Sequence, residues 1–488
     1  MILQNILESG KYMSISLKDY KMKKGKFISP WNDLEINITE NPWFQNRLPE
    51  YIWLALIFDK FERTEALKIC WNIMLSFQEK NVNSLCMSEL LEYENHQQRD
   101  IWDTVSKFAG KETISPLTII FTHSKYPVFS NCFSCITSSV DERYEKIEDA
   151  MKKASCHQTH LSTDIRFVVL YYSVLTKKLG IIKETAEALS RYPHLSHDDA
   201  EMEIIRPMIR SAEMGLDFTY KTNYEYLKFF WEEISAMTSC QPFYVDFKSE
   251  TTDTDEYITK VKEIMDYYSD IFISVKPLDN KMLVLLGIAT YSYKRLLELV
   301  NCNLYNEISG RSIIRVLIEN YIMMKYLLKH ESEHTDIWSE YQYYGIGQYK
   351  LIYLRSQENY ANPKSHVPYP YLGILINEYT DQQFLDMDTK YFDKHNVREK
   401  AIDVGEKDLF GLYYDYDSAF EHGLWGAIRE SAMLKCSSAG HQFHCIPDVE
   451  NNQKLNSVWP DCRSVMNKTL QVLKDTYTLP DCYTIPED

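Results

Sequence analysis

Apolar side chains recur every three to four residues through most of this chain, and this spacing constrains the fold more than any other feature. Residues 309–330 show it most clearly. Five apolar side chains there share one side of a helix: Ile313, Leu317, Tyr321, Met324 and Leu328. Helix-breaking residues are scarce, with 15 glycines and 16 prolines in 488 residues. Long helices are therefore favoured over a turn-rich β architecture, and the sequence predicts an all-α protein.

The opposite side of this helix is also committed to contacts. It alternates charge with isoleucine, in the order Arg311, Arg315, Ile318, Glu319 and Ile322. Such a side makes a poor solvent surface, because isoleucine avoids water and the charges between the isoleucines then need partners. We therefore expect the arginine row (Arg311, Arg315 and Glu319) to meet polar groups on a neighbouring helix. Ser309 precedes the row and is a candidate N-cap.

Residues 409–448 carry a second helical pattern with two distinct sides. The apolar side consists of Leu412, Tyr416, Phe420, Leu424, Ala427 and Ile428. The other side is a polar stripe of Ser418, His422, Trp425 and Arg429. A solvated stripe is one interpretation, because polar helix faces usually are solvated. Trp425 favours the other interpretation, in which the stripe lies under another helix, with the arginine row as its partner. His422→Ala is then expected to lower the melting temperature.

The length of the chain exceeds the roughly 250–300 residues that one hydrophobic core supports. We predict two packed helical domains or a continuous helical array. The stretch 248–256, KSETTDTDE, has no apolar residue and is the clearest break in composition. It separates an N-terminal helical domain, 1–247, from a C-terminal helical domain, 258–488, which carries the candidate site.

Acidic residues outnumber basic ones, 70 against 53, which gives a formal net charge of −17. No long basic run interrupts this balance, so a broad nucleic-acid surface is not expected. A local pocket for RNA formed by Arg311, Arg315 and Arg429 stays compatible with the charge. The N-terminus lacks a basic and then apolar leader, and the longest apolar runs fall short of the ~20 residues that cross a bilayer. We expect a cytoplasmic protein without membrane contact.

The eleven cysteines are an odd number in a chain without a secretion signal, so reduced thiols are expected. Two groups have spacings that resemble zinc ligand sets: Cys132, Cys135, Cys156 and His160, and separately Cys436, His441 and His444. The first group begins in an apolar stretch, where free buried cysteine is common. The second places Cys445 beside His444, and adjacent residues bind one ion poorly. Both groups stay open as zinc sites, but we expect less than stoichiometric zinc, no metal site and no other cofactor.

Four motifs in the C-terminal half occur in an order that resembles a known family. They are R-S-I-I-R-x3-E at 311–319, Y-G-x-G-Q-x-K-L at 344–351, S-x3-H-G at 418–423 and C-x4-H-x2-H at 436–444. This order resembles an uncharacterised all-helical bacterial domain family of unknown function. The resemblance implies a helical fold, a bacterial cytoplasmic setting and an association with mobile-element and antiviral-defence loci. It supplies no reaction.

Two functions stay open on the sequence. In the first, the chain is a binding or regulatory protein whose partner is another protein or a second copy of itself. Its polar residues then form a buried network: Arg311, Arg315, Glu319, Ser418, His422 and Arg429. In the second, the chain is a metal-independent RNase or other phosphodiester-cleaving effector. His422 would then act as general acid or base, and Arg311, Arg315 or Arg429 would stabilise phosphate charge.

The binding or regulatory function is favoured. No nucleotide-binding loop or hydrolase motif indicates a different reaction. Position in space separates the two hypotheses, because catalysis requires His422 and an arginine to line an open pocket. A network bonded to itself would favour the structural role.

Overall fold

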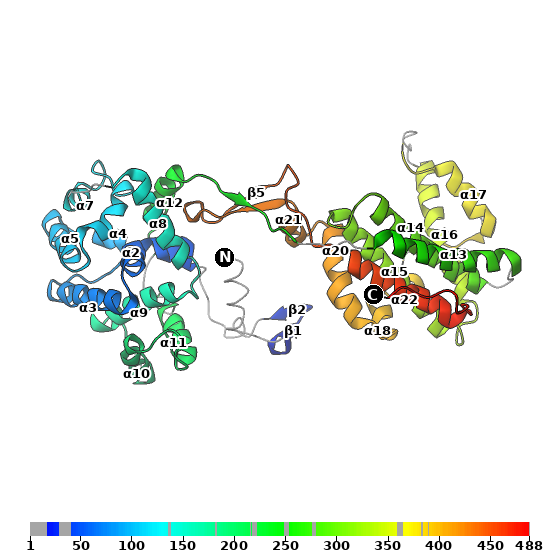
Figure 1. Ribbon diagram of the computed structural model, residues 1–488, viewed down its shortest axis with the longest axis horizontal. Coiled ribbons are helices and arrows are strands. Elements are labelled where there is room, and N and C mark those ends of the chain that lie inside the picture. The colour runs from blue at the N-terminus through cyan, green and yellow to red at the C-terminus, as the bar shows by residue number, and fades with distance from the viewer. Residues whose placement is uncertain are drawn as a thin grey trace. The chain divides into compact units, whose positions relative to one another are not determined.

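The computed structural model describes residues 17–28, 41–134, 138–180, 183–214, 216, 222–247, 253–275, 280–358, 365–381, 384–388 and 390–487. Helices make up most of these residues, whose strands form one sheet of two strands and one of three. The predicted all-α fold is confirmed (Figure 1). Cys135 and the first part of the predicted polar break, residues 248–252, lie outside the described residues.

The chain forms two compact units that are not continuous in sequence. The first consists of Met1–Phe243 and Lys435–Cys445, and the second of Tyr244–Leu434 and Ile446–Asp488. The chain therefore passes from one unit to the other three times. The predicted division into domains 1–247 and 258–488 has a single passage between domains, which corresponds to the first of these three. Composition gives no sign of the other two, because a short segment that packs far from its sequence neighbours leaves no break in composition.

The first unit is built around α2 (Ile52–Lys60). Residues Ile52–Phe58 are all buried, and this segment is accordingly apolar on every side instead of along one stripe. Helices α3, α6, α8 and α9 contact it. The other helices of the unit are α3 (Arg63–Glu79), α4 (Met87–Leu90), α5 (Asn95–Ala109), α6 (Lys111–Ile114), α7 (Pro127–Cys132), α8 (Val140–Ala154), α9 (His160–Leu175), α10 (Lys183–Arg191), α11 (Met202–Met214) and α12 (Tyr224–Met237). Short helices η1 (Leu17–Asp19), η3 (Trp43–Arg47) and η4 (Leu48–Tyr51) precede α2, while η5 (Ser115–Ile119) follows α6 and η6 (Tyr192–His194) follows α10.

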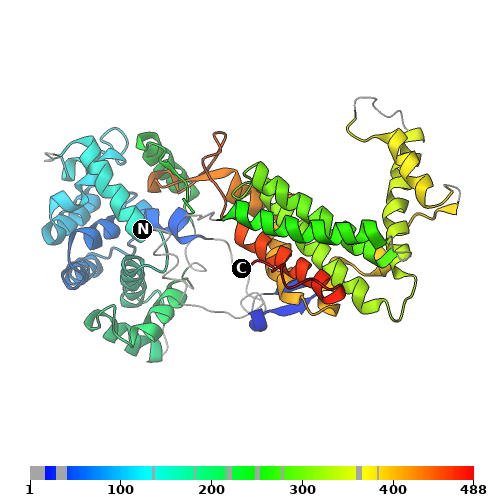
Figure 2. The ribbon, with the colours of Figure 1, turned by 45° about the vertical axis from the view of Figure 1, so that its right-hand side comes forward.

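The second unit is built around α15 (Ile308–His330), which contacts α14, α16, α18, α20 and α22. Its predicted apolar side is buried at Ile313, Leu317, Tyr321 and Met324. The other helices are α13 (Thr254–Val275), α14 (Asn280–Asn301), α16 (Ile337–Glu358), α17 (Tyr369–Tyr379), α18 (Val397–Asp403), α19 (Lys407–Leu409), α20 (Asp415–Glu421), α21 (Trp425–Ser431) and α22 (Trp459–Thr476). Short helices η9 (Phe392–Lys394) and η10 (Phe410–Tyr414) precede α18 and α20. Helices α13, α14 and α22 lie side by side in Figure 2.

Two details of the predicted helices are wrong. Ser309 lies inside α15, whose N-cap is Glu307, so Ser309 does not cap the helix. The pattern at 409–448 is not one helix, because α20 ends at Glu421 and α21 begins at Trp425. Gly423 lies between them with a φ of 57°, a left-handed conformation that glycine adopts without steric cost. The Leu424 N–H donates to the Ala419 carbonyl at 2.9 Å, which completes a Schellman C-cap.

Two small antiparallel sheets were not predicted. Strands β1 (Lys21–Lys23) and β2 (Lys26–Ile28) form a hairpin. Strands β3 (Pro242–Phe243), β4 (Met433–Cys436) and β5 (Cys445–Pro447) form the second sheet, in the order β3-β4-β5. Its register pairs Pro242 with Cys436 and Phe243 with Lys435. The second sheet thus brings the end of the long N-terminal segment beside residues 435–445, which belong to the same unit.

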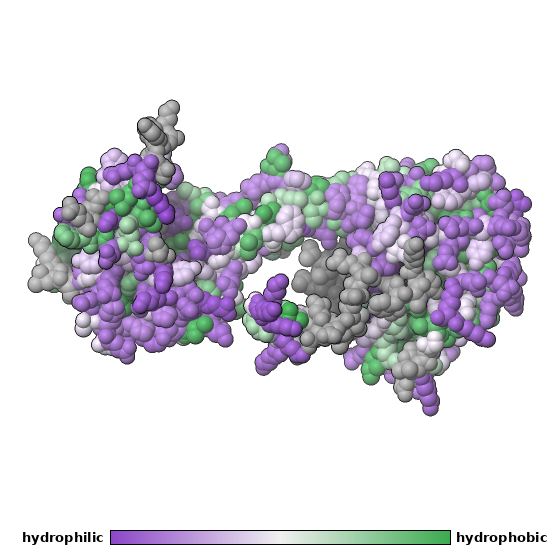
Figure 3. Space-filling model, turned by 180° about the vertical axis from the view of Figure 1, so that it is seen from behind, coloured by the Kyte–Doolittle hydropathy of each residue, from purple (hydrophilic) through white to green (hydrophobic). Residues whose placement is uncertain are grey.

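Hydrophilic residues cover much of the face of the molecule in Figure 3, with hydrophobic residues in smaller patches. Across the described ranges, every helix is too short or too polar to cross a membrane.

Candidate functional site

Arg315 joins α15 to the segment formed by η10 and α20. Its Nε donates to Ser418 Oγ at 3.1 Å, and its Nη2 donates to the Tyr414 hydroxyl at 2.6 Å. The guanidinium lies 4.7 Å from the centre of the Tyr414 ring and 3.8 Å from the Glu319 carboxylate. The predicted contact between the arginine row and the polar stripe is confirmed for Arg315 and Ser418. Tyr414 also belongs to this network, although no sequence pattern singles it out.

Arg311 lies one helical turn earlier and is 4% exposed. Its Nη2 donates to the Asn456 carbonyl at 2.5 Å, and its guanidinium lies 5.8 Å from the Phe420 ring. Two carboxyls share its surroundings. Burial raises the pKa of Asp417 to about 7, although the Arg311 charge acts to lower it. Burial likewise raises the pKa of Asp461 against the same arginine. Arg311 is therefore a buried cation among two carboxyls, not a solvent-facing donor.

His422 and Arg429 do not join this network. His422 is the C-terminal cap of α20 and is exposed, while Arg429 Nη1 donates to the Met433 carbonyl at 3.2 Å. Within the described part of the chain, neither side chain bonds to the arginine row. The prediction that both face this row is wrong, because the pattern does not continue as one helix beyond Glu421.

Large apolar side chains around this break are exposed. The exposed fractions are 69% for Leu412, 55% for Leu424, 67% for Trp425 and 38% for Ile428. Together with Tyr416, which is also exposed, they are here named the α20–α21 apolar surface. The predicted burial of this side holds at Phe420 and Ala427. The expectation that Trp425 lies under another helix is wrong in this unit.

Two cavities lie away from the polar stripe. One, of about 310 Å³, is in the first unit between the end of α2 and α9, where its lining includes Arg63 and Asp164. Those two groups bond to each other at 2.9 Å, and Asp164 also accepts from Tyr192 at 2.7 Å. The other, of about 410 Å³, lies between α13 and α14. His422 lines neither cavity.

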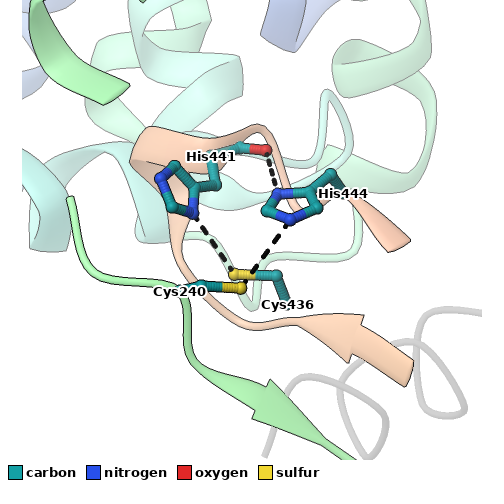
Figure 4. A group of neighbouring side chains, drawn as sticks. All are labelled: Cys240, Cys436, His441 and His444. Atoms are coloured by element: carbon teal, nitrogen blue, oxygen red, sulfur yellow. Dashed lines mark hydrogen bonds between the residues drawn. The ribbon is translucent and has the colours of Figure 1, made fainter. Parts of the chain in front are cut away.

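A group of metal-ligand side chains lies in the first unit (Figure 4). Cys240, Cys436, His441 and His444 place their ligand atoms within 4.8 Å of one another. Cys240 Sγ lies 3.7 Å from His444 Nε2, and Cys436 Sγ lies 3.8 Å from His441 Nδ1. Within the described ranges this is the one such group of three or more cysteine, histidine and acidic residues. Cys436, His441 and His444 form the second predicted Cys/His group. The fourth member is Cys240, not Cys445, which follows His444 in the sequence.

The loop after β4 owes its shape to close packing on the first unit. Ala439 is fully buried in the core of that unit, and Phe443 lies 5.1 Å from the Phe44 ring. A side chain at Gly440 would collide with Thr238, so only glycine allows this approach to the end of α12. Left-handed turns at Gln442 and the following residue then return the chain to β5. Both histidines are thereby directed back toward the end of β4.

Hydrogen bonds prepare two of the four side chains, His444 and Cys436, as ligands. His444 Nδ1 lies 3.1 Å from the His441 carbonyl, which can only accept, so Nδ1 carries the proton and Nε2 presents a lone pair. The N–H groups of Gln241 and Ser438 donate to Cys436 Sγ at 3.4 Å each. Burial acts to raise the pKa of the Cys436 thiol, but these two bonds, together with side-chain hydrogen bonds from Ser438 and Cys240, bring it below its ordinary value.

The first predicted Cys/His group does not assemble in the described residues. His160 lies against His197 with ring centres 4.1 Å apart, and its Nδ1 accepts from Arg206 at 3.1 Å. Burial lowers the pKa of His160 to about 4, with help from His197 and Arg206. Its partners are therefore an arginine and a second imidazole, not the thiols of Cys132 and Cys156.

Comparison with known families supports the resemblance seen in the motif order. Residues 283–441 match the model of DUF5677, a family of unknown function. The DUF5677 region begins in α14 and contains the arginine row, the polar stripe, Cys436 and His441. The predicted resemblance to an uncharacterised helical family in the C-terminal half is confirmed. Neither the curated proteins nor the solved structures gave a match to the chain.

Two important residues lie outside what local spacing can identify. Cys240 precedes the DUF5677 region and is separated from Cys436 by the whole of α13 to α21. A short Ser-Cys-Gln-Pro stretch with no periodic pattern was its only signal. Asp417 lies within the DUF5677 region but on neither side of the predicted helix. Its burial opposite Arg311 follows from tertiary packing, which local spacing does not report.

Proposed function

We propose that this chain is a binding or regulatory protein, and that its partner is another protein. The observation that carries the proposal is the bonding of Arg315, whose donors are directed at Ser418 and Tyr414 within the same unit. An arginine that stabilises a phosphate in a cleavage reaction needs its donors aimed at the substrate. The network instead holds α15 against α20, as expected of a half-buried polar network whose donors bond within the protein.

The chemistry of the partner follows from the α20–α21 apolar surface. Leu424, the N-cap of α21, and Trp425, its first residue, are both more than half exposed. Large exposed apolar side chains of this kind mark protein interaction sites more often than solvent surface, and tryptophan is enriched at the centre of such interfaces. The partner is therefore a protein with an apolar groove or patch. The resemblance of the motif order extends the proposal to a regulatory role in bacterial antiviral-defence or mobile-element loci.

The binding site is tested by placing a photocrosslinking amino acid at position 425 or, as a matched control, at position 71. Trp71 is a partly exposed tryptophan of α3 in the first unit. We expect a crosslinked product of one defined mass from position 425 and none from position 71, either with purified chain alone or with extract of the source cells. Equal labelling from both positions would contradict the proposal.

The RNase alternative has its own test. Purified chain is incubated with single-stranded and structured RNA without added metal, beside His422→Ala. We expect no cleavage above background from either protein. Cleavage by the unaltered chain that disappears in His422→Ala, with no change in melting temperature, would replace the binding proposal by catalysis, because a general acid or base contributes about 10²- to 10⁴-fold in rate.

A further inference from the structure

The Cys/His group of the first unit has the dimensions of a metal site. Cys240 Sγ to His444 Nε2 measures 3.7 Å and Cys436 Sγ to His441 Nδ1 measures 3.8 Å, with all four ligand atoms within 4.8 Å. A tetrahedral zinc ion, with bonds of about 2.3 Å to sulfur and about 2.0–2.1 Å to nitrogen, separates its ligands by roughly 3.3–3.8 Å. The four atoms therefore need to move little to surround one ion.

We propose that Cys240, Cys436, His441 and His444 bind one zinc ion, which holds the loop of residues 436–445 on the first unit. All four ligands belong to that unit. The proposal is independent of the binding function inferred for the second unit.

The arrangement is poorly explained by hydrogen bonding alone. A thiol is a weak donor and a weak acceptor, and sulfur-to-nitrogen distances of 3.7 and 3.8 Å give little energy without a metal. The two imidazoles and two thiols nevertheless point toward one centre (Figure 4). Ordering four side chains costs conformational entropy, and a shared ion would offset that cost.

The outer contacts of the ligands are those of a metal site. Metal-binding histidines usually donate their second ring nitrogen to a carbonyl or carboxylate, which fixes the tautomer. His444 does this with its Nδ1 and the His441 carbonyl at 3.1 Å. The Cys436 sulfur accepts two backbone N–H groups at 3.4 Å, from Gln241 and Ser438. Both contacts are compatible with a bound ion, since His444 Nδ1 is not the ligand atom and a thiolate sulfur keeps further lone pairs that can accept N–H donors.

The donor set selects zinc. Two thiolates and two imidazoles in a tetrahedral arrangement are typical ligands of zinc, whereas oxygen ligands suit magnesium and calcium. Four protein ligands leave no open coordination position for water or substrate. The ion is therefore structural, and its effect is on folding instead of on a reaction.

The ligand spacing explains what the ion would stabilise. Cys240 follows α12 in the N-terminal segment, while the other three ligands lie in one short loop near the C-terminal end. Without the ion, that loop is held by packing of Ala439 and Phe443, by the two-residue pairing of β3 with β4, and by hydrogen bonds to α12 and the segment after it, such as Ser438 Oγ to the Ser239 carbonyl at 2.8 Å. With the ion, zinc binding energy adds directly to the free energy of docking the loop.

Metal content gives the first test. Full-length chain is purified without chelators from zinc-supplemented culture, and zinc, iron and copper are measured by elemental analysis. We expect one zinc per chain, lost on Cys240→Ser and on His444→Asn. The matched control is Cys445→Ser, a half-buried thiol in the same loop that is not part of the group, which should keep its zinc. Absence of zinc from the unaltered chain, another metal in its place, or retention of zinc by Cys240→Ser would each overturn the proposal.

A second test uses the unaltered chain, so it does not depend on whether a variant folds. Cys240 is exposed and so is Cys302. An alkylating reagent should modify Cys302 at once but Cys240 only after a zinc chelator is added, because a zinc-bound thiolate is a poor nucleophile. Replacement of zinc by cobalt should give the intense visible bands of a tetrahedral site with thiolate ligands. Equal alkylation of both thiols before chelation would contradict the assignment, as would a Cys240–Cys436 disulfide that leaves neither thiol to alkylate.

Discussion

Arg311 and Arg315 lie one helical turn apart on α15 and meet different surroundings. Arg315 is partly exposed and bonds to uncharged hydroxyls, whereas Arg311 is buried near Asp417 and Asp461. The fully buried position is the more costly one, because a charge removed from water is stabilised only by close partners. The protonation state of Asp417 therefore affects the stability of the folded chain.

Asp417→Asn tests this balance through pH. Burial raises the pKa of Asp417 from 3.8 to about 7 in the folded chain. The folded state thus holds a proton that the unfolded state releases, so the stability of the unaltered chain falls as pH rises through this window. Asparagine has no such proton. We expect the stability of Asp417→Asn relative to the unaltered chain to rise from pH 5 to pH 8, by on the order of 2 kcal/mol.

The measurement is the urea unfolding midpoint at both pH values. Asp415→Asn is the control, because Asp415 is exposed two residues away and its substitution should give no such trend. A relative stability of Asp417→Asn that is flat or falls with pH would show that the Asp417 carboxylate is not held in the folded state as described.

Removal of the Arg315 and His422 side chains should have unequal effects on stability. Arg315→Met leaves the Ser418 and Tyr414 hydroxyls without their donor and should cost about 1–3 kcal/mol. His422→Ala removes an exposed side chain and should change stability by less than about 0.5 kcal/mol. This reverses the expectation from sequence that His422→Ala lowers the melting temperature. Melting curves of the two variants measure the difference. A larger drop in melting temperature for His422→Ala than for Arg315→Met would support the expectation from sequence.

At the scale of elements, the turn at Gly423 determines which side chains of the polar stripe meet α15. Ser418 lies before the turn and bonds to Arg315, whereas Trp425 and Arg429 lie after it and face elsewhere. A residue with a side chain would be strained at a φ of 57°. The glycine thus separates Ser418 in α20, which bonds to α15, from Trp425 and Arg429 in α21.

Gly423→Ala and Gly426→Ala should change stability in opposite directions. Neither added methyl group would meet another atom within 4 Å. Gly423 has a left-handed φ, so alanine there should cost about 1–2 kcal/mol. Gly426 lies inside α21, where alanine should stabilise by about 0.4–1 kcal/mol by reducing the freedom of the unfolded chain. Chemical unfolding of both variants measures the two signs, and a shared sign would contradict the described turn.

Local spacing predicted what is local in this fold. The period of α15 gave both its buried side and the need for partners at Arg315, and those partners were found on α20. Spacing also predicted, wrongly, that the helix continues past Gly423, because apolar residues recur at helical spacing on both sides of the turn. Glycine often ends a helix, but the interpretation gave the regular spacing more weight than Gly423. The position of Cys240 beside Cys436 could not be predicted from local spacing, because it depends on the pairing of two strands that are far apart in the sequence.

At the scale of the whole molecule, residues 435–445 should share the stability of the first unit. Ala439 and Phe443 pack on that unit, so unfolding of the first unit also releases the loop. Ile57→Ala in α2 should cost the first unit about 2–5 kcal/mol. We therefore expect amide exchange of residues 437–443 to accelerate by roughly 30-fold or more, the factor that corresponds to 2 kcal/mol.

Leu317→Ala in α15 is the matched control, because both substitutions remove a fully buried aliphatic side chain. It should accelerate exchange in α15 and leave residues 437–443 nearly unchanged. Hydrogen exchange followed by mass spectrometry reports both regions in one experiment. Faster loop exchange in the Leu317→Ala chain alone would place the loop with the second unit.

The division of each unit into two stretches of sequence also sets an order in time. A ribosome that has made Met1–Phe243 must still add residues 244–434 before the last segment of the first unit emerges. At about 5–20 residues per second, this interval lasts roughly 10–40 s. During it, the surface that receives Ala439 and Phe443 is open and apolar, and Cys240 has none of its three companions. A nascent chain therefore exposes this apolar surface during one defined interval, which ends when His444 leaves the exit tunnel.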